Sequence, residues 1–217
     1  MSLDGVRRIA ALGKPIVWTM HDMWPMTGIC HHAGLCDRFT DRCGRCPFLG
    51  RPSRCRDLSS RIFDRKMKLY NAVDIRFVAV SRWLAGQAAR SALLAGRHVE
   101  VINNAFPLDR YPVEPTLSRR ALGLPDDGRR LVVMCAARLD DSIKNLPAAI
   151  DALNLYEGST PIAAVFCGDI RRPELLDSLK IPYVSLGNIT DADRLAQIYA
   201  HCDVVLSSSS FESLPST

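Results

Sequence analysis

The sequence lacks several features that mark common classes of protein. No segment approaches the roughly 18 consecutive apolar residues of a membrane-spanning helix. Neither a Walker A sequence nor a GxGxxG motif occurs, which excludes the usual nucleotide-triphosphate and dinucleotide signatures. Residues 1–12 contain no long apolar core and no small-residue cleavage site, so we expect no secretory signal and a cytoplasmic location. Disulfides are therefore not expected among the eight cysteines.

Charge is distributed unevenly along a chain of otherwise ordinary globular composition, with 47% hydrophobic and 24% charged residues. Residues 1–104 contain 17 Lys and Arg against 8 Asp and Glu, a net charge of +9, whereas residues 105–217 contain 11 against 15, a net charge of −4. The asymmetry indicates two units. The first suits an anionic partner such as a lipid headgroup, a phosphate or a nucleic acid, and a solvated Arg-rich surface is the alternative.

Apolar runs alternate with amphipathic segments in both halves of the chain. In the first half we expect helices at 4–12, 57–70 and, capped by Ser81, to about 94, and strands at 15–20, 75–80 and 98–102. After a Pro-rich linker at 107–116 we expect strands at 131–137, 162–167, 182–186 and 203–206, with helices capped by Asn145 and Thr190 and a short one at 173–180. This alternation predicts an α/β fold with parallel, doubly wound sheets.

Ligands bind outside the carboxyl ends of the strands in such sheets. The residues just after the expected strands are therefore candidate site residues, namely His21, Asp22, Ser81, Asn103, Asn104, Arg138, Gly168, Asp169 and Glu212.

Two cations and one carboxylate in the second half suggest specific chemistry. Arg138 and Lys144 lie beside an expected helix N-terminus and could bind a diphosphate. The alternative is that they are two unrelated cations on the surface. The Glu212 carboxylate could accept hydrogen bonds from the hydroxyl groups of a sugar. The alternative is that the segment around Glu212 is an ordinary N-cap region of a helix.

The loop after the first strand is dense in reactive side chains. Four of its cysteines, Cys30, Cys36, Cys43 and Cys46, are either the ligands of a structural zinc ion or reduced thiols in a packed loop. Cys43 and Cys46 form a CxxC pair, but the C-x5-C spacing of the other two is wider than usual, and His31 or His32 could replace one thiolate. The scattered Cys135, Cys167 and Cys202 lie in or beside apolar runs and read as small hydrophobic residues.

Three segments together resemble the retaining glycosyltransferases of family-4 type (glycosyl transferases group 1), which have the GT-B architecture. They are PIVWTMHDMWPMTGICHHAGLCDRFTDRCGRCP, then VAVSRWLA with VINNAFPLDRY, then AARLDDSIKN through VFCGD to SSSFESLPST. The resemblance implies two incomplete Rossmann-like domains. Residues 1–104 would be the acceptor-side domain without its first strands, and residues 105–217 the nucleotide-sugar donor domain, truncated at its C-terminus.

The resemblance also implies an activity and roles for residues. The activity is transfer of a hexose, with retention, from a nucleotide-diphosphate sugar to a saccharide or lipid-linked acceptor in polysaccharide biosynthesis. No cofactor is required, because cations stabilise the leaving group. His21, Arg138 and Lys144 are the expected catalytic residues. Donor contacts are expected from Arg138, Lys144, Gly168, Glu212 and Leu214, and acceptor contacts from His21, Asp22, Ser81 and Asn104.

The sequence departs from the family pattern at three places. Asn145 stands where the family usually has glycine, and neither the upstream Gly-rich loop nor the second carboxylate of the E-x7-E motif is present. We therefore expect weak or no turnover from these 217 residues alone. Peripheral contact with an inner membrane is expected from the basic half.

Two other functions compete with transfer. A zinc-stabilised basic module for nucleic acid needs exposed aromatics among its cations, and only Trp24 and Trp83 are candidates, so no nucleic-acid partner is expected. A non-catalytic α/β scaffold predicts that Arg138, Lys144 and Glu212 do not converge.

Overall fold

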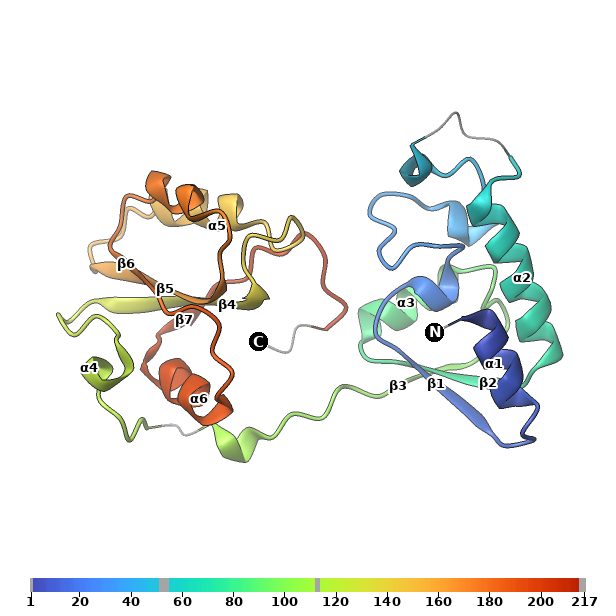
Figure 1. Cartoon of the computed structure of the whole chain (residues 1–217), viewed down its shortest axis with the longest axis horizontal. Coiled ribbons are helices and arrows are strands. Elements are labelled where there is room, and N and C mark those ends of the chain that lie inside the picture. The colour runs from blue at the N-terminus through green and yellow to red at the C-terminus, as the bar shows by residue number, and fades with distance from the viewer. Residues whose placement is uncertain (1, 51–54, 112–113, 215–217) are drawn as a thin grey trace. The chain divides into compact units, whose positions relative to one another are not determined.

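The computed structural model describes residues 2–50, 55–111 and 114–214 (Figure 1). The chain forms two compact units, one made of residues 2–105 together with 213 and 214, the other of residues 106–212. The boundary falls next to the expected Pro-rich linker, of which residues 112 and 113 lie outside the described residues. In the part of the chain described here, no helix is both long and apolar enough to cross a membrane.

The first unit is built on a parallel three-stranded sheet in the order β1-β2-β3. The strands are β1 (Ile16–Met20), β2 (Ile75–Ala79) and β3 (Val99–Val101), and the helices are α1 (Leu3–Ala10), α2 (Leu58–Ala72) and α3 (Arg82–Arg90). The described residues of the long loop between β1 and α2 include the 3-10 turns η1 (Trp24–Met26), η2 (Arg38–Thr40) and η3 (Pro47–Leu49).

Aromatic packing and helix capping explain the position of α2 and α3. Tyr70 of α2 packs edge-on against Phe77 of β2, with ring centroids 5.2 Å apart. Asp57 caps α2 by accepting from the Ser60 N–H. Ser81 caps α3 by accepting from the Leu84 N–H, as predicted, but α3 ends at Arg90 and not near residue 94.

The second unit contains a parallel four-stranded sheet in the order β6-β5-β4-β7. Its strands are β4 (Arg130–Arg138), β5 (Ile162–Asp169), β6 (Tyr183–Ser185) and β7 (Val204–Val205). Its helices are α4 (Arg119–Leu122), α5 (Leu146–Asn154) and α6 (Ala192–His201), with 3-10 turns η4 (Leu108–Arg110) and η5 (Pro173–Ser178).

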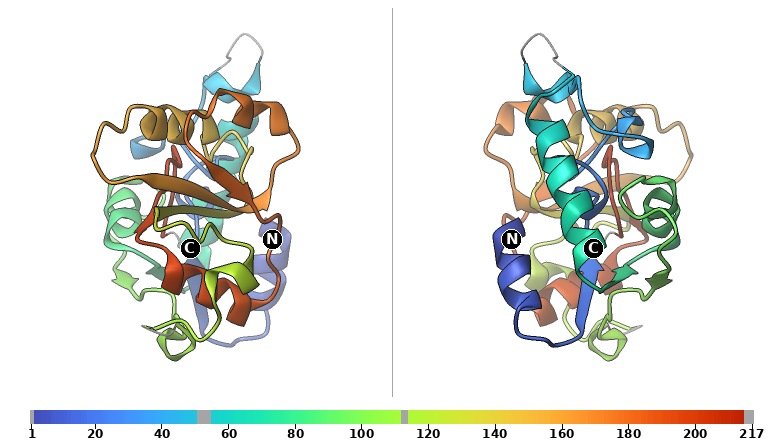
Figure 2. Two further views of the ribbon diagram at one scale, coloured as in Figure 1. Left: turned by 90° about the vertical axis from the view of Figure 1, so that its left-hand side faces the viewer. Right: turned by 90° about the vertical axis from the view of Figure 1, so that its right-hand side faces the viewer.

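Helices cover both faces of this second sheet (Figure 2). Leu146, Ala149, Ile150 and Leu153 of α5 pack with Leu176 of η5 on one face. On the other face Leu122 near α4 and Ile198 of α6 form a second cluster, which includes Cys167 and is flanked by Cys135 and Cys202. The prediction that these three cysteines behave as small hydrophobic residues is confirmed.

Two predicted helix caps need correction. The cap of α6 is Asp191, whose carboxylate accepts from the Asp193 and Arg194 N–H groups, and not Thr190. Asn145 does precede α5, but its side chain makes no capping hydrogen bond, because its backbone is left-handed with φ of 52°. Asparagine tolerates this conformation better than most residues other than glycine. The segment expected as a helix at 173–180 is the 3-10 turn η5.

Candidate functional site

The strand order of the second sheet defines where a ligand would bind. Along the chain, β4 leads to β5 and β6 on one side, whereas β7 pairs with β4 on the other side. The order therefore reverses between β4 and β7. In open α/β sheets the crevice at the carboxyl ends of the two strands flanking such a reversal binds ligands.

The segments that leave β4 and β7 at this point are tied together by hydrogen bonds. The Ser208 hydroxyl donates to the Lys144 and Asn145 carbonyl oxygens at 2.8 and 3.0 Å. The Ser210 N–H donates to the Ile143 carbonyl oxygen at 2.8 Å. The serine run after β7 thus fixes the loop that leads into α5, which gives the run a structural role.

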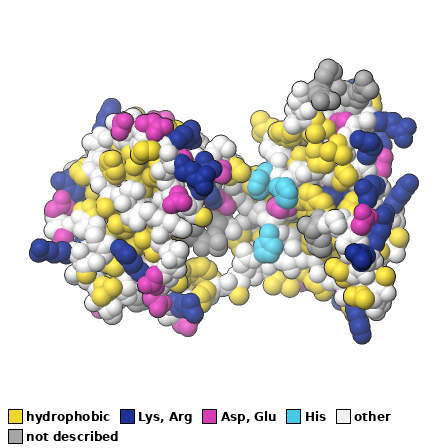
Figure 3. Space-filling view, in the orientation of Figure 1, with side chains coloured by type: hydrophobic (Ala, Val, Ile, Leu, Met, Phe, Trp, Pro, Cys, Tyr) yellow, Lys and Arg dark blue, Asp and Glu magenta, His cyan; other side chains and the backbone are white. Residues whose placement is uncertain are grey.

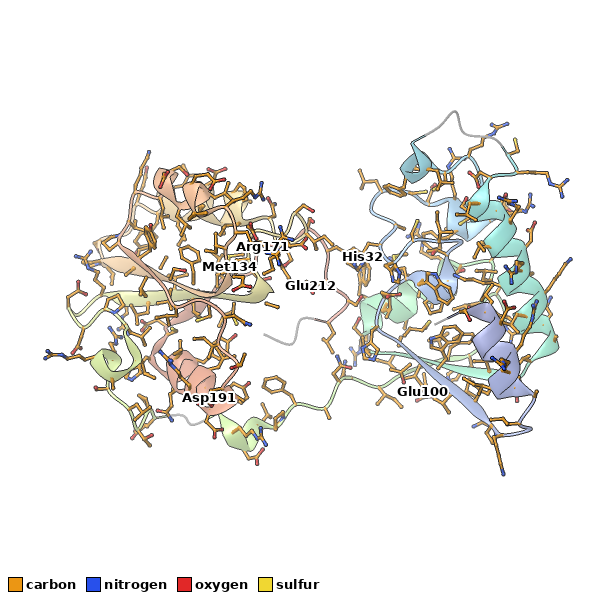
Figure 4. All side chains as sticks on the ribbon, in the orientation of Figure 1. His32, Glu100, Met134, Arg171, Asp191 and Glu212 are labelled. Carbon is orange, nitrogen blue, oxygen red and sulfur yellow. The ribbon has the colours of Figure 1, made fainter. Side chains whose placement is uncertain are left out.

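Lys144 and Glu212, distant in sequence, meet at this edge. Lys144 Nζ lies 2.6 Å from Glu212 Oε1, and the two side chains are 30% and 28% exposed. An ammonium group has three N–H donors, so one ion pair leaves capacity for a phosphate. Figure 4 shows Glu212 together with Arg171 beyond the ends of the strands. The contact of Lys144 with Glu212 goes against the scaffold hypothesis for these two residues, whereas the printed contact of Arg138 is with Asp140.

Arg138 is held by a residue that sequence reasoning missed. Its Nε donates to Oδ1 of Asp140 at 2.9 Å, and the other Asp140 oxygen accepts from the Arg171 and Arg172 N–H groups at 3.1 Å. Burial raises the pKa of Asp140, but hydrogen bonds and charges from Arg138 and Arg172 outweigh it, so the pKa is lowered. The carboxylate therefore stays ionised and orients Arg138. The only sequence signal was an acidic residue two positions after the strand-end arginine.

Gly168 of β5 lies against the backbone of Ala136 in β4. Its φ is 147°, and a Cβ at this position would lie 1.8 Å from the Ala136 carbonyl oxygen. Beside it a cavity of about 700 Å³ opens at the carboxyl ends of β5 and β6, with Asp169, Glu174 and Asp177 in its wall. Carboxylates of this kind suit the hydroxyl groups of a ribose or a sugar.

In the first unit the candidate residues His21, Asp22, Ser81 and Asn104 all follow the carboxyl ends of strands. Ser81 serves as a helix cap, and its hydroxyl also donates to the Ser213 carbonyl oxygen at 2.6 Å. Asp22 Oδ2 lies 2.7 Å from Nδ1 of His31, a residue considered in the sequence only as a cysteine substitute. Histidine side chains gather on the surface of this unit in Figure 3.

Side chains fix the loop that follows Asp22. Lys66 of α2 is fully buried, and its Nζ donates to the carbonyl oxygens of Trp24, Thr27 and Gly28 at 2.5, 2.9 and 3.1 Å. It also lies 3.6 Å above the Trp24 ring, a cation–π contact. Trp24 is thus part of the packing of the first unit. In the sequence Lys66 stands three residues after Phe63 and four before Tyr70, so helical spacing places it on the buried face of α2, although a lysine is rarely buried.

The four clustered cysteines lie near one another. Cys43 and Cys46 are buried, and Cys30 and Cys36 are partly exposed. Burial, followed by the neighbouring Cys46, Cys43 and Cys36, raises the pKa of Cys30 to about 11. The Gly28 N–H points at Cys43 Sγ, 3.2 Å away. Within residues 2–50, 55–111 and 114–214, no three His, Cys, Asp or Glu side chains are placed as a preformed metal site.

Comparisons with known proteins give structural matches alone. No protein-family model matches the sequence, and no curated protein matches it. The chain is similar to the crystal structure of Anabaena Alr3699/HepE in complex with UDP, with 18% identity and a TM-score of 0.59 over 95% of this chain and 50% of that one. The chain is also similar to the structure of the same protein in complex with UDP and glucose, with 18% identity and a TM-score of 0.55 over 96% of this chain and 51% of that one.

A glycosyltransferase from Rickettsia africae ESF-5 is more weakly similar, with 21% identity, a TM-score of 0.48, and 66% and 41% of the two chains covered. The chain thus spans about half the length of the solved structures that it matches. The similarity to HepE confirms the fold class, an α/β chain with two parallel sheets of the Rossmann-like kind found in GT-B proteins.

Proposed function

We propose that this chain belongs to a retaining hexosyltransferase that uses a nucleotide-diphosphate sugar. The observation that carries the proposal is the ion pair of Lys144 and Glu212, which lie in the segments that follow β4 and β7, the two strands at the strand-order reversal of the second sheet. Two further facts support it: the fold is shared with HepE, which was crystallised with UDP, and the sequence resembles family-4-type enzymes.

The donor would bind to the second unit. Arg138 and Lys144 would hold the diphosphate and stabilise the negative charge that develops on it as the sugar leaves, without a metal cofactor. Glu212, with Leu214 and the backbone at Gly168, would contact the donor sugar. The cavity at the ends of β5 and β6 would take the nucleoside, whose ribose hydroxyls suit its carboxylates. Asp140 acts here as a positioning residue for Arg138.

The acceptor would bind to the first unit, near His21, Asp22, Ser81 and Asn104. We assign His21 to positioning and polarising the acceptor. A saccharide or lipid-linked acceptor in polysaccharide biosynthesis fits the net charge of +9 on residues 1–104, which favours contact with an anionic membrane surface on the cytoplasmic side.

A thermal-shift screen with nucleotide-diphosphate sugars tests the proposal on the full-length protein. A donor at about 100 times its Kd should stabilise the folded state by about 2.7 kcal/mol and raise Tm, because it binds the folded state alone. Free nucleosides, which lack the diphosphate, serve as the control. Failure of every diphosphate sugar to raise Tm above the nucleoside value would count against the assignment.

For the cysteine cluster we propose a structural zinc ion held by Cys30, Cys36, Cys43 and Cys46, with reduced thiols as the alternative. The CxxC pair and the closeness of Cys30 to the other three support it, and binding would have to draw the sulfur atoms together. Metal analysis should find about one zinc ion per chain, and a chelator should lower Tm. Metal-free folded protein with all four thiols open to titration would exclude zinc.

A further inference from the structure

The Asp22 carboxylate is divided between two partners. Oδ1 accepts from the Trp24 N–H at 2.7 Å, and Oδ2 pairs with Nδ1 of His31 at 2.7 Å. The Met23 N–H also donates to the His31 carbonyl oxygen at 2.9 Å, so a backbone hydrogen bond joins the same two parts of the loop as the side-chain pair. The His31 side chain is 66% exposed and that of Asp22 31% exposed. The Asp22 end of the pair is therefore fixed by the backbone, and the His31 end is accessible to solvent.

This pairing determines what the imidazole offers to a ligand. A carboxylate only accepts hydrogen bonds, so Nδ1 of His31 carries the hydrogen, and in the neutral ring Nε2 then presents a lone pair. A carboxylate that fixes the tautomer and orientation of a histidine is a recurrent device in sites where that ring contacts a ligand. A hydroxyl group, which is both a donor and an acceptor, is the ligand group that matches an exposed Nε2.

Buried side chains anchor the loop that carries the pair. Five consecutive carbonyl oxygens, those of residues 24–28, each accept a hydrogen bond from a buried side chain. Lys66 binds three of them, the Tyr70 hydroxyl binds that of Pro25 at 2.9 Å, and the Ser91 hydroxyl binds that of Met26 at 2.6 Å. Anchoring of this kind preorganises a site, because little order remains to be imposed when a ligand arrives.

We propose that Nε2 of His31 accepts a hydrogen bond from a hydroxyl group of a saccharide bound at the carboxyl end of the first sheet. Asp22 and Lys66 are its positioning residues. The inference deepens the proposed function and rests on it, because it adds a second acceptor-side contact to His21. The sequence resemblance gives His31 no role, and the hydrogen bond to Asp22 is the observation that assigns it one.

Nitrogen-15 NMR of the histidine rings tests the geometry first. We expect the neutral form of His31 to carry its hydrogen on Nδ1 and not on Nε2, and Asp22→Asn to abolish this preference. Octyl glucoside, maltose and lactose are then titrated in. At least one should shift the His31 Nε2 signal with saturation. His31→Ala should raise the Kd for that saccharide about tenfold. His31→Gln places an acceptor near the Nε2 position, so its Kd should stay within about threefold of the wild-type value.

His98→Ala is the matched control, because His98 also pairs with a carboxylate, that of Glu100 at 3.0 Å, but lies before β3 and not after a strand. It should leave saccharide binding unchanged. The proposal is overturned by the opposite tautomer at His31, by no response to any of the three saccharides, or by equal binding of His31→Ala and the wild type. A parallel titration with UDP separates the two claims: saccharide binding without UDP binding contradicts the transferase and not the hydroxyl site.

Discussion

Gly168→Ala is expected to unfold or severely loosen the second unit. The added Cβ would lie 1.8 Å from the Ala136 carbonyl oxygen, and the atom it meets is backbone of the neighbouring strand, which cannot rotate away. The φ of 147° adds strain for any residue with a side chain. We expect a loss of at least about 3 kcal/mol in the free energy of unfolding, in the range of the most damaging single substitutions.

Gly128→Ala separates the two causes, because Gly128 also has a positive φ, 81°, but nothing lies within 4 Å of its added Cβ. It should cost only about 1 kcal/mol. All three tryptophans, Trp18, Trp24 and Trp83, lie in the first unit, so tryptophan fluorescence reports on that unit and hydrogen exchange of β4 and β5 on the other. Equal stability of the two variants would show that β4 and β5 do not approach as described.

Lys66→Ala should destabilise the first unit by about 3 kcal/mol. It leaves a cavity in the core and three buried carbonyl oxygens without their donor, and each effect costs a few kcal/mol. Burial lowers the pKa of Lys66 to about 7, so removal of the buried charge offsets part of this loss. The measurement is urea unfolding followed by tryptophan fluorescence.

Two further variants identify the cause of that loss. Lys68→Ala removes an exposed lysine from the same helix and should leave the fluorescence midpoint nearly unchanged. Lys66→Met refills the volume without the donors, so it should recover only part of the stability. If Lys66→Ala and Lys68→Ala unfold at the same urea concentration, the buried hydrogen bonds do not anchor the loop.

The fold was largely predictable because its signals are local. Short apolar runs such as residues 162–167, and residues 75–79 with Arg76 as their one exposed position, favour buried strands, and the helices between them show a clear apolar stripe. The wrong predictions concern the ends of helices, where neighbouring polar side chains compete to cap the first turn. Asp191 displaced Thr190 as a cap because its carboxylate reaches two N–H groups, and Asn145 lost its capping role to a left-handed backbone.

The site was less predictable because its contacts are long-range. The position of Lys144 after a strand is visible in the sequence, but its pairing with Glu212, 68 residues away, depends on β7 lying next to β4. Asp140 and Lys66 carry charges that usually face water, and only the packed structure shows them buried. His31 follows a cysteine, so its sequence context indicates a metal ligand, whereas its partner Asp22 is evident only in the folded loop.

The most direct test of the central claim is a calorimetric titration of the protein with UDP. The wild type should bind, and Lys144→Ala should raise the Kd about tenfold or more, since a charge-assisted contact to phosphate is worth at least about 1.4 kcal/mol. Lys180→Ala is the control, because Lys180 is exposed and precedes β6, at the opposite edge of the sheet. Absence of UDP binding by the folded wild type, or equal effects of the two substitutions, would contradict a donor site at the β4–β7 reversal.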